Sequence, residues 1–170
     1  MLSIREALRR AAVATPRKIG FGMGYHFEDF EIGKTYVSPR RTVIDADIML
    51  FAGLTGDFNP IHTDDIYASG TNFGQRIAHG PMLVGMAFGL ASRTGMFDGT
   101  VLGLLEIGWT FQGAVKPGDT VHVRAEVLGK RPTAKPDRGV VHLQLDVLNQ
   151  TDKLVQRGKA SVMFKCRPPG

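Results

Sequence analysis

Residues 56–62 read GDFNPIH and place a carboxylate, Asp57, and an imidazole, His62, five positions apart with a proline between them. On one continuous helix that separation would turn the two side chains to different faces, because a turn takes about 3.6 residues. Pro60 also pushes Asn59 out of the helical region and has no backbone N–H to donate. The stretch therefore predicts a loop of fixed shape that aims both titrating groups at one point.

An Asp and a His held by one rigid loop can share acid and base duties, because burial and neighbouring groups tune each of them. Asn59 can hydrogen-bond a ligand or lock the loop. A capping Asp, a turn Asn and a surface His would also explain the three residues one at a time. The fixed arrangement G-D-x-N-P-x-H favours the chemical interpretation, with Asp57 and His62 as candidate catalytic residues.

A second candidate is the stretch AHGPM at residues 78–82, at the start of a long apolar segment. Backbone N–H groups at the N-terminus of a helix stabilise a developing oxyanion, and the helix dipole adds to this. Gly80 would let a substrate carbonyl come close to its N–H, although it could also simply make the turn. For His79 the residue type favours an ordinary structural role.

Metal and nucleophile chemistry have less support. His62 with Asp64 and Asp65 could suggest a metal site, but adjacent carboxylates that cap a helix explain the two acids more simply. No metal site is therefore predicted. Nucleophilic catalysis lacks an evident base beside the candidate nucleophiles, which are Ser69, Ser92 and Cys166.

The elements that must position these groups follow from hydrophobic patterning. Residues 41–44 predict a strand, and Asp45 then predicts the N-cap of a helix that stops near Gly56. Residues 63–68 suit a second short helix. Residues 81–94, PMLVGMAFGLASRT, are apolar on nearly every side and begin with a proline, which predicts a buried helix.

The second half of the chain predicts strands. Apolar and polar residues alternate over residues 121–127 and 141–147, and residues 154–165 predict a less regular third strand. Residues 116–119 have the proline and glycine that a type II turn prefers, and residues 131–138 predict a long, mobile linker. The architecture is therefore α+β, with one antiparallel sheet wrapped around a central buried helix.

Composition narrows the class of protein. A length of 170 residues, with 43% hydrophobic and 22% charged, is typical of one globular domain, expected at residues 21–170. A single cysteine excludes an internal disulfide and predicts a reducing, cytoplasmic location. The sequence contains no run of about 18 apolar residues, so no membrane span is predicted. The net charge of +5 is spread along the chain without an RNA-binding or zinc-finger motif, so no nucleic-acid partner is predicted.

Residues 1–20 stand apart as a basic extension whose apolar residues have helical spacing. An Arg-rich, acid-poor start of this kind is either a short docking helix or frayed extension, or an organelle transit peptide. The transit peptide would place the protein in an organelle matrix.

Three stretches together resemble one family. FAGLTGDFNPIH at residues 51–62 with Ala68 beyond it, AHGPM, and WTF with VKPGD within residues 109–119 are similar to the MaoC-like, (R)-specific enoyl-CoA hydratases. The likeness runs from Tyr25 to Lys165. It implies a hot-dog fold, a homodimer or higher homo-oligomer, and an acyl tunnel at the subunit interface.

Members of that family add water to trans-2-enoyl-CoA, or remove it from an (R)-3-hydroxyacyl-CoA, without a metal or an organic cofactor. By this resemblance Asp57 and His62 form a catalytic dyad that activates the water, and the Gly80 N–H polarises the thioester carbonyl. Asn59 would hold the loop and also position the thioester arm of the substrate. Some relatives carry a serine where residues 85–89 have no hydroxyl, which leaves the acyl preference open.

Two alternatives stay open. A hot-dog acyl-CoA thioesterase would use the same tunnel with an acidic base, and the complete pair of Asp57 and His62 makes it the poorer choice. A non-catalytic acyl-CoA-binding subunit would need neither group. Release of free thiol from an acyl-CoA would separate a thioesterase from a hydratase, and tight binding without turnover would favour the binding subunit.

Overall fold

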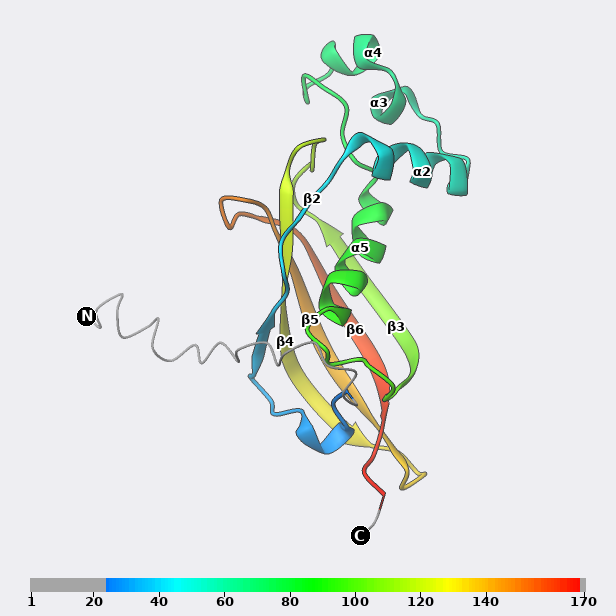
Figure 1. Ribbon diagram of the computed structural model, residues 1–170, viewed down its shortest axis with the longest axis vertical. Helices are drawn as coiled ribbons and strands as arrows, with labels where there is room; N and C mark the ends of the chain where they lie inside the picture. Colours follow the sequence, from blue (N-terminus) through cyan, green and yellow to red (C-terminus); the bar gives the residue numbers. More distant parts are fainter. Residues whose placement is uncertain (1–23, 169–170) are drawn as a thin grey trace, which may run out of the picture.

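One curved antiparallel sheet and one long helix, α5, make up the body of the protein, and three further helices gather beyond one end of α5 (Figure 1). The computed structural model describes residues 24–168, so the basic extension predicted at residues 1–20 lies outside the described part. Within that part no helix has the length and apolar character that a membrane crossing needs. The elements in chain order are η1 (Phe27–Asp29), β1 (Thr35–Val37), β2 (Arg41–Thr42), α2 (Asp45–Thr55), α3 (Pro60–Thr63), α4 (Asp65–Ser69), α5 (Gly80–Ser92), β3 (Val101–Phe111), β4 (Thr120–Pro132), β5 (Arg138–Leu148) and β6 (Leu154–Lys165).

The strands lie in the order β1-β4-β5-β6-β3, each antiparallel to its neighbours, and β2 also pairs with β4. The alternation predicted over residues 121–127 and 141–147 is confirmed, because the apolar residues of both stretches are buried. They share one core with Leu83 and Leu90 of α5. The α+β architecture predicted from the sequence, a sheet wrapped around a helix, is therefore confirmed.

The helix α5 is buried on one side only. Its buried residues are Met82, Leu83, Ala87, Leu90 and Ala91. Pro81, Gly85 and Gly89 form an exposed stripe along it. The prediction of a helix buried on every side is wrong for this stripe, because the sheet covers one side of α5 and no side chain projects from the two glycines.

The strand β3 was not among the predicted strands. It is the edge strand beside β6, and its pairing is irregular at two places near its start, between Val101 and Gly103 and between Leu104 and Glu106. Such irregularities break the period-two pattern by which a strand is recognised. Four of its apolar side chains are between 41% and 50% exposed, namely Leu102, Leu104, Leu105 and Ile107.

Two turns show where sequence patterning succeeds and fails. The type II turn predicted at residues 116–119 is confirmed by a 3.0 Å hydrogen bond between its end residues and a φ of 93° at its glycine. The long linker predicted over residues 131–138 is wrong. The strands β4 and β5 extend into it, and the Thr133 hydroxyl closes the short remaining turn by donating to the Arg138 carbonyl at 3.1 Å.

A charged row crosses the sheet on the face away from the core. Asp146 on β5 lies between Arg124 on β4 and Arg157 on β6 in the strand register. Its carboxylate accepts hydrogen bonds of 2.6 Å from Arg157 and 3.0 Å from Arg124. Burial opposes ionisation, but the bonds to the two guanidiniums outweigh it and hold the pKa of Asp146 below its usual range.

Candidate active site

The motif GDFNPIH runs from the end of α2 into α3, and these helices gather with α4 beyond the N-terminal end of α5 (Figure 1). The helix α2 begins at Asp45 with Ile44 as its N-cap, so the predicted cap at Asp45 is wrong by one residue. The carboxylate of Asp47 fixes this start by accepting the Ile44 N–H at 3.1 Å. The helix ends at Gly56, as predicted, where a φ of 78° favours glycine.

Side-chain hydrogen bonds fix the shape of the loop after α2. Oδ1 of Asp57 accepts the Asn59 N–H at 3.2 Å, and Oδ1 of Asn59 accepts the Ile61 N–H at 3.2 Å. Pro60 begins α3, where its missing N–H leaves no helical bond unmade. The loop predicted through residue 62 is wrong beyond Asn59, because His62 stands on this short helix, which Asn59 caps.

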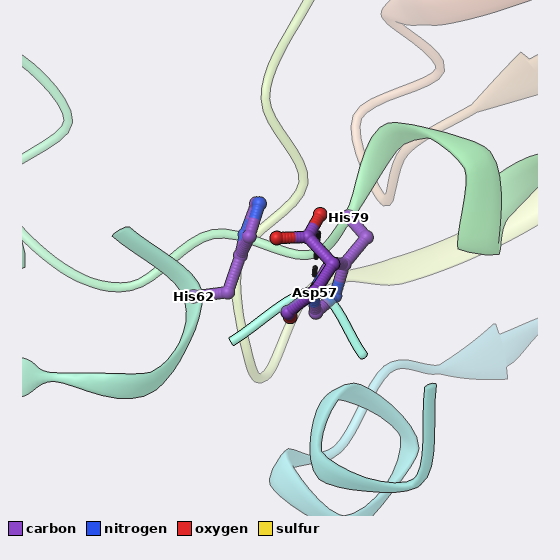
Figure 2. Close-up of side chains that lie close together, drawn as sticks. All are labelled: Asp57, His62 and His79. Atoms are coloured by element: carbon purple, nitrogen blue, oxygen red, sulfur yellow. Dashed lines mark hydrogen bonds and ion pairs between the residues drawn. The ribbon is translucent and has the colours of Figure 1, made fainter. Parts of the chain in front are cut away.

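Figure 2 shows Asp57, His62 and His79 gathered in one place. Nδ1 of His62 lies 2.7 Å from the backbone oxygen of Ile77. Since a carbonyl oxygen only accepts hydrogen bonds, Nδ1 of the neutral ring carries the proton and Nε2 keeps a free lone pair. His62 is half-buried and the Asp57 side chain is 52% exposed, so both can meet a substrate.

His79 joins the two candidate catalytic residues, which its sequence position did not indicate. Its side chain is 1% exposed, and its ring stacks on that of His62 with the centroids 3.8 Å apart and the planes 28° apart. Nε2 donates a hydrogen bond of 2.9 Å to the backbone oxygen of Asp57. Nδ1 is buried and has no hydrogen-bond partner within residues 24–168. The structural role expected for His79 thus includes holding Asp57 and His62 together.

Asp57, His62 and His79 each have one potential metal-ligand atom within 4.8 Å of those of the other two. Two imidazoles and a carboxylate are groups that can act as zinc ligands. Hydrogen bonds to backbone carbonyls already occupy one nitrogen of each ring, Nδ1 of His62 and Nε2 of His79. A metal ion would have to take the remaining nitrogens, of which that of His79 is buried.

Asp64 and Asp65, which the sequence placed near His62, serve the fold instead. Asp64 accepts two backbone N–H groups at the start of α4. Asp65 accepts a 2.6 Å bond from Arg76, and Arg76 also binds Asp45 on α2 at 2.9 Å. These contacts agree with the capping interpretation, and among the described residues no metal-type cluster contains either acid.

Gly80 is the first residue of α5, directly after His79. Its N–H therefore has no carbonyl inside the helix to which it could donate. The ring of Phe111 packs so closely that a Cβ at Gly80 would lie 2.9 Å from Cε1 of that ring. The Gly80 carbonyl accepts a 3.2 Å hydrogen bond from Nε2 of Gln156. This is the position at which the sequence predicts an oxyanion donor.

Two cavities adjoin the cluster. One has a volume of about 290 Å3, and its lining includes His62, Ile77, Gly80, Phe111 and Gln156. The other is an open groove of about 570 Å3 between α2 and α5, and its lining includes Leu50, Phe51, Leu54, Met82, Gly85 and Gly89. The centroid of the Phe51 ring lies 5.0 Å from that of His79, so the groove ends beside the cluster.

Residues 29–148 match the family model of the MaoC like domain. The chain belongs to the MaoC-like family. The (R)-specific enoyl-CoA hydratase of Rhodospirillum rubrum is 32% identical to this MaoC-like chain over 143 residues, which cover 84% of the chain and 94% of that protein. The protein MaoC of Klebsiella aerogenes is 39% identical over 113 residues, 66% of this chain and 33% of its own length.

The 3-hydroxybutyryl-CoA dehydratase of Methylorubrum extorquens is 35% identical to the MaoC-like chain over 102 residues, 60% of the chain and 63% of that protein. The chain thus spans a third of the Klebsiella protein and less than two thirds of the Methylorubrum enzyme.

Solved structures show the same fold as this MaoC-like chain. The MaoC-like dehydratase from Rhodospirillum rubrum has a TM-score of 0.76 at 32% identity, over 86% of this chain and 100% of that one. The Mycobacterium tuberculosis protein Rv0216, described as a double hot-dog fold, has a TM-score of 0.77 at 24% identity, over 86% of this chain and 47% of that one. The predicted hot-dog fold is confirmed.

Proposed function

We propose that this MaoC-like chain is a hydro-lyase that adds water to a trans-2-enoyl-CoA, or removes it from an (R)-3-hydroxyacyl-CoA. The observation that carries the proposal is the setting of His62. Its bond to the Ile77 carbonyl leaves the lone pair of Nε2 free, its side chain lies close to Asp57, and His62 and Gly80 line the same cavity. Relatives named (R)-specific enoyl-CoA hydratase and 3-hydroxybutyryl-CoA dehydratase support this assignment.

Asp57 and His62 act as the acid and base of the reaction. In hydration the water oxygen bonds to the β-carbon while one water proton passes to the dyad, and the dyad delivers a proton to the α-carbon. The two transfers cancel, so the dyad returns to its starting protonation state. Dehydration reverses each step. The free lone pair of His62 and the exposed carboxylate of Asp57 support these roles.

The Gly80 N–H stabilises the negative charge that develops on the thioester oxygen. It stands at the start of α5, where the helix dipole also favours negative charge. One such donor typically contributes about 10²- to 10³-fold in rate. Asn59 supports the dyad indirectly, since its side chain caps the helix that carries His62, and we assign it to holding the loop.

We assign the substrate to the two cavities near the dyad. The groove along α5 has an apolar wall that includes Leu50 and Leu54, and it suits the acyl chain. Gly85 and Gly89 present no side chain to the groove, so an extended chain can lie against the helix backbone. In this proposal the thioester lies at Gly80 in the smaller cavity, and the carrier arm leaves through that cavity.

We further propose that the chain is a homodimer paired through β3. An edge strand presents unpaired N–H and C=O groups, which another strand can pair with. The exposed apolar side chains of β3, Leu102, Leu104, Leu105 and Ile107, would be covered by the same contact in a second copy. The dimer would bring the open side of the substrate path against a neighbouring subunit.

The proposal is tested by following the enoyl-thioester absorbance with crotonyl-CoA and longer trans-2-enoyl-CoAs. Wild type should consume the band and form the (R)-alcohol. Asp57→Asn and His62→Gln should each lower kcat at least about 10²-fold, the typical contribution of one positioned acid or base. Asp137→Asn is the matched control, because it changes an exposed carboxylate on the β4–β5 turn.

The outcomes of this assay separate the alternatives. Wild-type rates in either dyad variant would refute the assignment of Asp57 and His62. Release of free thiol without loss of the double bond would indicate a thioesterase. Tight binding of every enoyl-CoA without turnover would indicate a non-catalytic binding subunit.

A further inference from the structure

A buried glutamine on β6 faces the first residue of α5. Gln156 is 3% exposed. Its Nε2 donates to the Gly80 carbonyl at 3.2 Å, and its Oε1 accepts from the indole Nε1 of Trp109 at 2.9 Å. The side chain therefore joins Trp109 on β3 to the N-terminus of α5 through a chain of two hydrogen bonds.

The chemistry of the two partners dictates which way the amide of Gln156 points. An indole N–H only donates and a backbone carbonyl only accepts. With Oε1 toward Trp109 and Nε2 toward Gly80, both bonds are made. The flipped amide would set donor against donor and acceptor against acceptor in a site with almost no access to water.

Packing contacts also fix Trp109 and Gly80, the two partners of Gln156. The Trp109 ring lies over Gly158, where a Cβ would overlap the ring, and it also packs near Phe88 with the centroids 6.2 Å apart. Phe111 pairs with Gln156 across the two strands and presses its ring against Gly80. The strands β3 and β6 thus hold Gly80 in two ways, by a hydrogen bond to its carbonyl and by a ring against its Cα.

We infer that Gln156 is a positioning residue that sets the Gly80 N–H for the thioester oxygen. This inference rests on the proposed function, in which that N–H is the oxyanion donor. Glycine has the freest backbone of any residue, and the Gly80 N–H is not held inside the helix. On its other side, His79 ties the same helix start to the Asp57 carbonyl. Gln156 and His79 together therefore set the oxyanion donor relative to the dyad.

The first test replaces Gln156 and measures kcat and KM separately. Gln156→Met keeps a similar length and removes both bonds. Gln156→Glu, in its ionised form, keeps an acceptor for Trp109 and removes the donor to Gly80. Both variants should lower kcat about 10- to 100-fold, because a displaced donor loses most of its effect, and should change KM less than about 3-fold. Val127→Ala, a core truncation on β4, is the stability control: it should lower Tm and leave kcat unchanged.

The second test observes the carbonyl directly, in protein whose turnover is blocked by Asp57→Asn. Crotonyl-CoA bound to this variant should show its thioester C=O stretch shifted to lower frequency, because the Gly80 N–H polarises the bond. Adding Gln156→Met should remove much of that shift. If Gln156 only stabilised the fold, Gln156→Met would leave the frequency of the C=O stretch unchanged.

Different results would overturn the proposed function and the role of Gln156. Absence of turnover in wild type with every enoyl-CoA would overturn the proposed function. Normal wild-type turnover, with an unchanged kcat and an unchanged C=O stretch in the Gln156 variants, would overturn only the role of Gln156. A lower kcat with an unchanged KM, together with a smaller shift of the C=O stretching frequency, would support the role of Gln156.

Discussion

Replacement of His79 by Phe tests whether this buried imidazole organises the site. Phe keeps a ring against His62 and Phe51 but cannot donate to the Asp57 carbonyl. The lost hydrogen bond contributes about 0.5–1.5 kcal/mol net. The loss should stay within that range, because the bond joins two neutral groups.

The same substitution also removes Nδ1 of His79, which is buried without a partner in the described part of the chain. A buried polar atom left unpaired costs about 1–3 kcal/mol, so its removal offsets the lost bond. The free energy of unfolding should therefore change by less than about 1.5 kcal/mol. In contrast, kcat should fall about 10-fold or more, because a catalytic group displaced by about 1 Å can lose 10²-fold in rate.

Urea unfolding and initial rates with an enoyl-CoA measure the two quantities on the same preparation. His142→Phe is the matched control, since His142 is a half-buried histidine on β5 that bonds Ser161 away from the site. It should keep the wild-type kcat. An unchanged kcat in His79→Phe would refute the organising role, and a loss of stability above about 3 kcal/mol would refute the reasoning about Nδ1.

Four further predictions concern other parts of the protein. Gly80→Ala should lower kcat at least about 10-fold in the enoyl-thioester assay, because its methyl group would push the Phe111 ring out of place. The pKa of Asp146 in the folded protein is below that of an unfolded aspartate, which is about 3.9. The ionised Asp146 therefore stabilises the fold fully above about pH 3.9, and this contribution is lost as the pH falls through the folded pKa. Urea melts of Asp146→Asn and wild type should therefore differ by about 1–3 kcal/mol at pH 7, and the difference should disappear as the pH falls through the folded pKa of Asp146. Dialysis against EDTA should leave kcat unchanged, and a loss restored by Zn²⁺ would show that Asp57, His62 and His79 hold a metal ion. In sedimentation experiments wild type should be the proposed dimer and Leu104→Lys a monomer, because the substitution places a charge in the proposed β3 contact.

The parts of the fold that could be predicted from the sequence are those set by local rules. The strands over residues 121–127 and 141–147 alternate because one face of each is buried. The end of α2 at Gly56 follows from the left-handed conformation that glycine adopts easily. The strand β3 was missed because irregular pairing and an exposed edge remove the alternation on which a prediction depends.

In the candidate site, too, local features could be predicted from the sequence and contacts between distant residues could not. The motif GDFNPIH points to Asp57 and His62 because proline and asparagine chemistry restrict a short stretch of chain. The contacts that complete the cluster join residues far apart in the chain. The bond of His62 to Ile77 spans 15 positions, that of His79 to Asp57 spans 22, and that of Gln156 to Gly80 spans 76. These contacts exist only once the sheet and α5 have packed.

The most direct test of the proposed reaction is to incubate the protein with crotonyl-CoA in D2O and analyse the product by NMR. Hydration through the Asp57–His62 dyad predicts (R)-3-hydroxybutyryl-CoA with one deuterium on the α-carbon, and no product from Asp57→Asn. Free coenzyme A with unsaturated acid that carries no deuterium would contradict the account and identify a thioesterase. Equal deuterium incorporation by Asp57→Asn would contradict the role of the dyad.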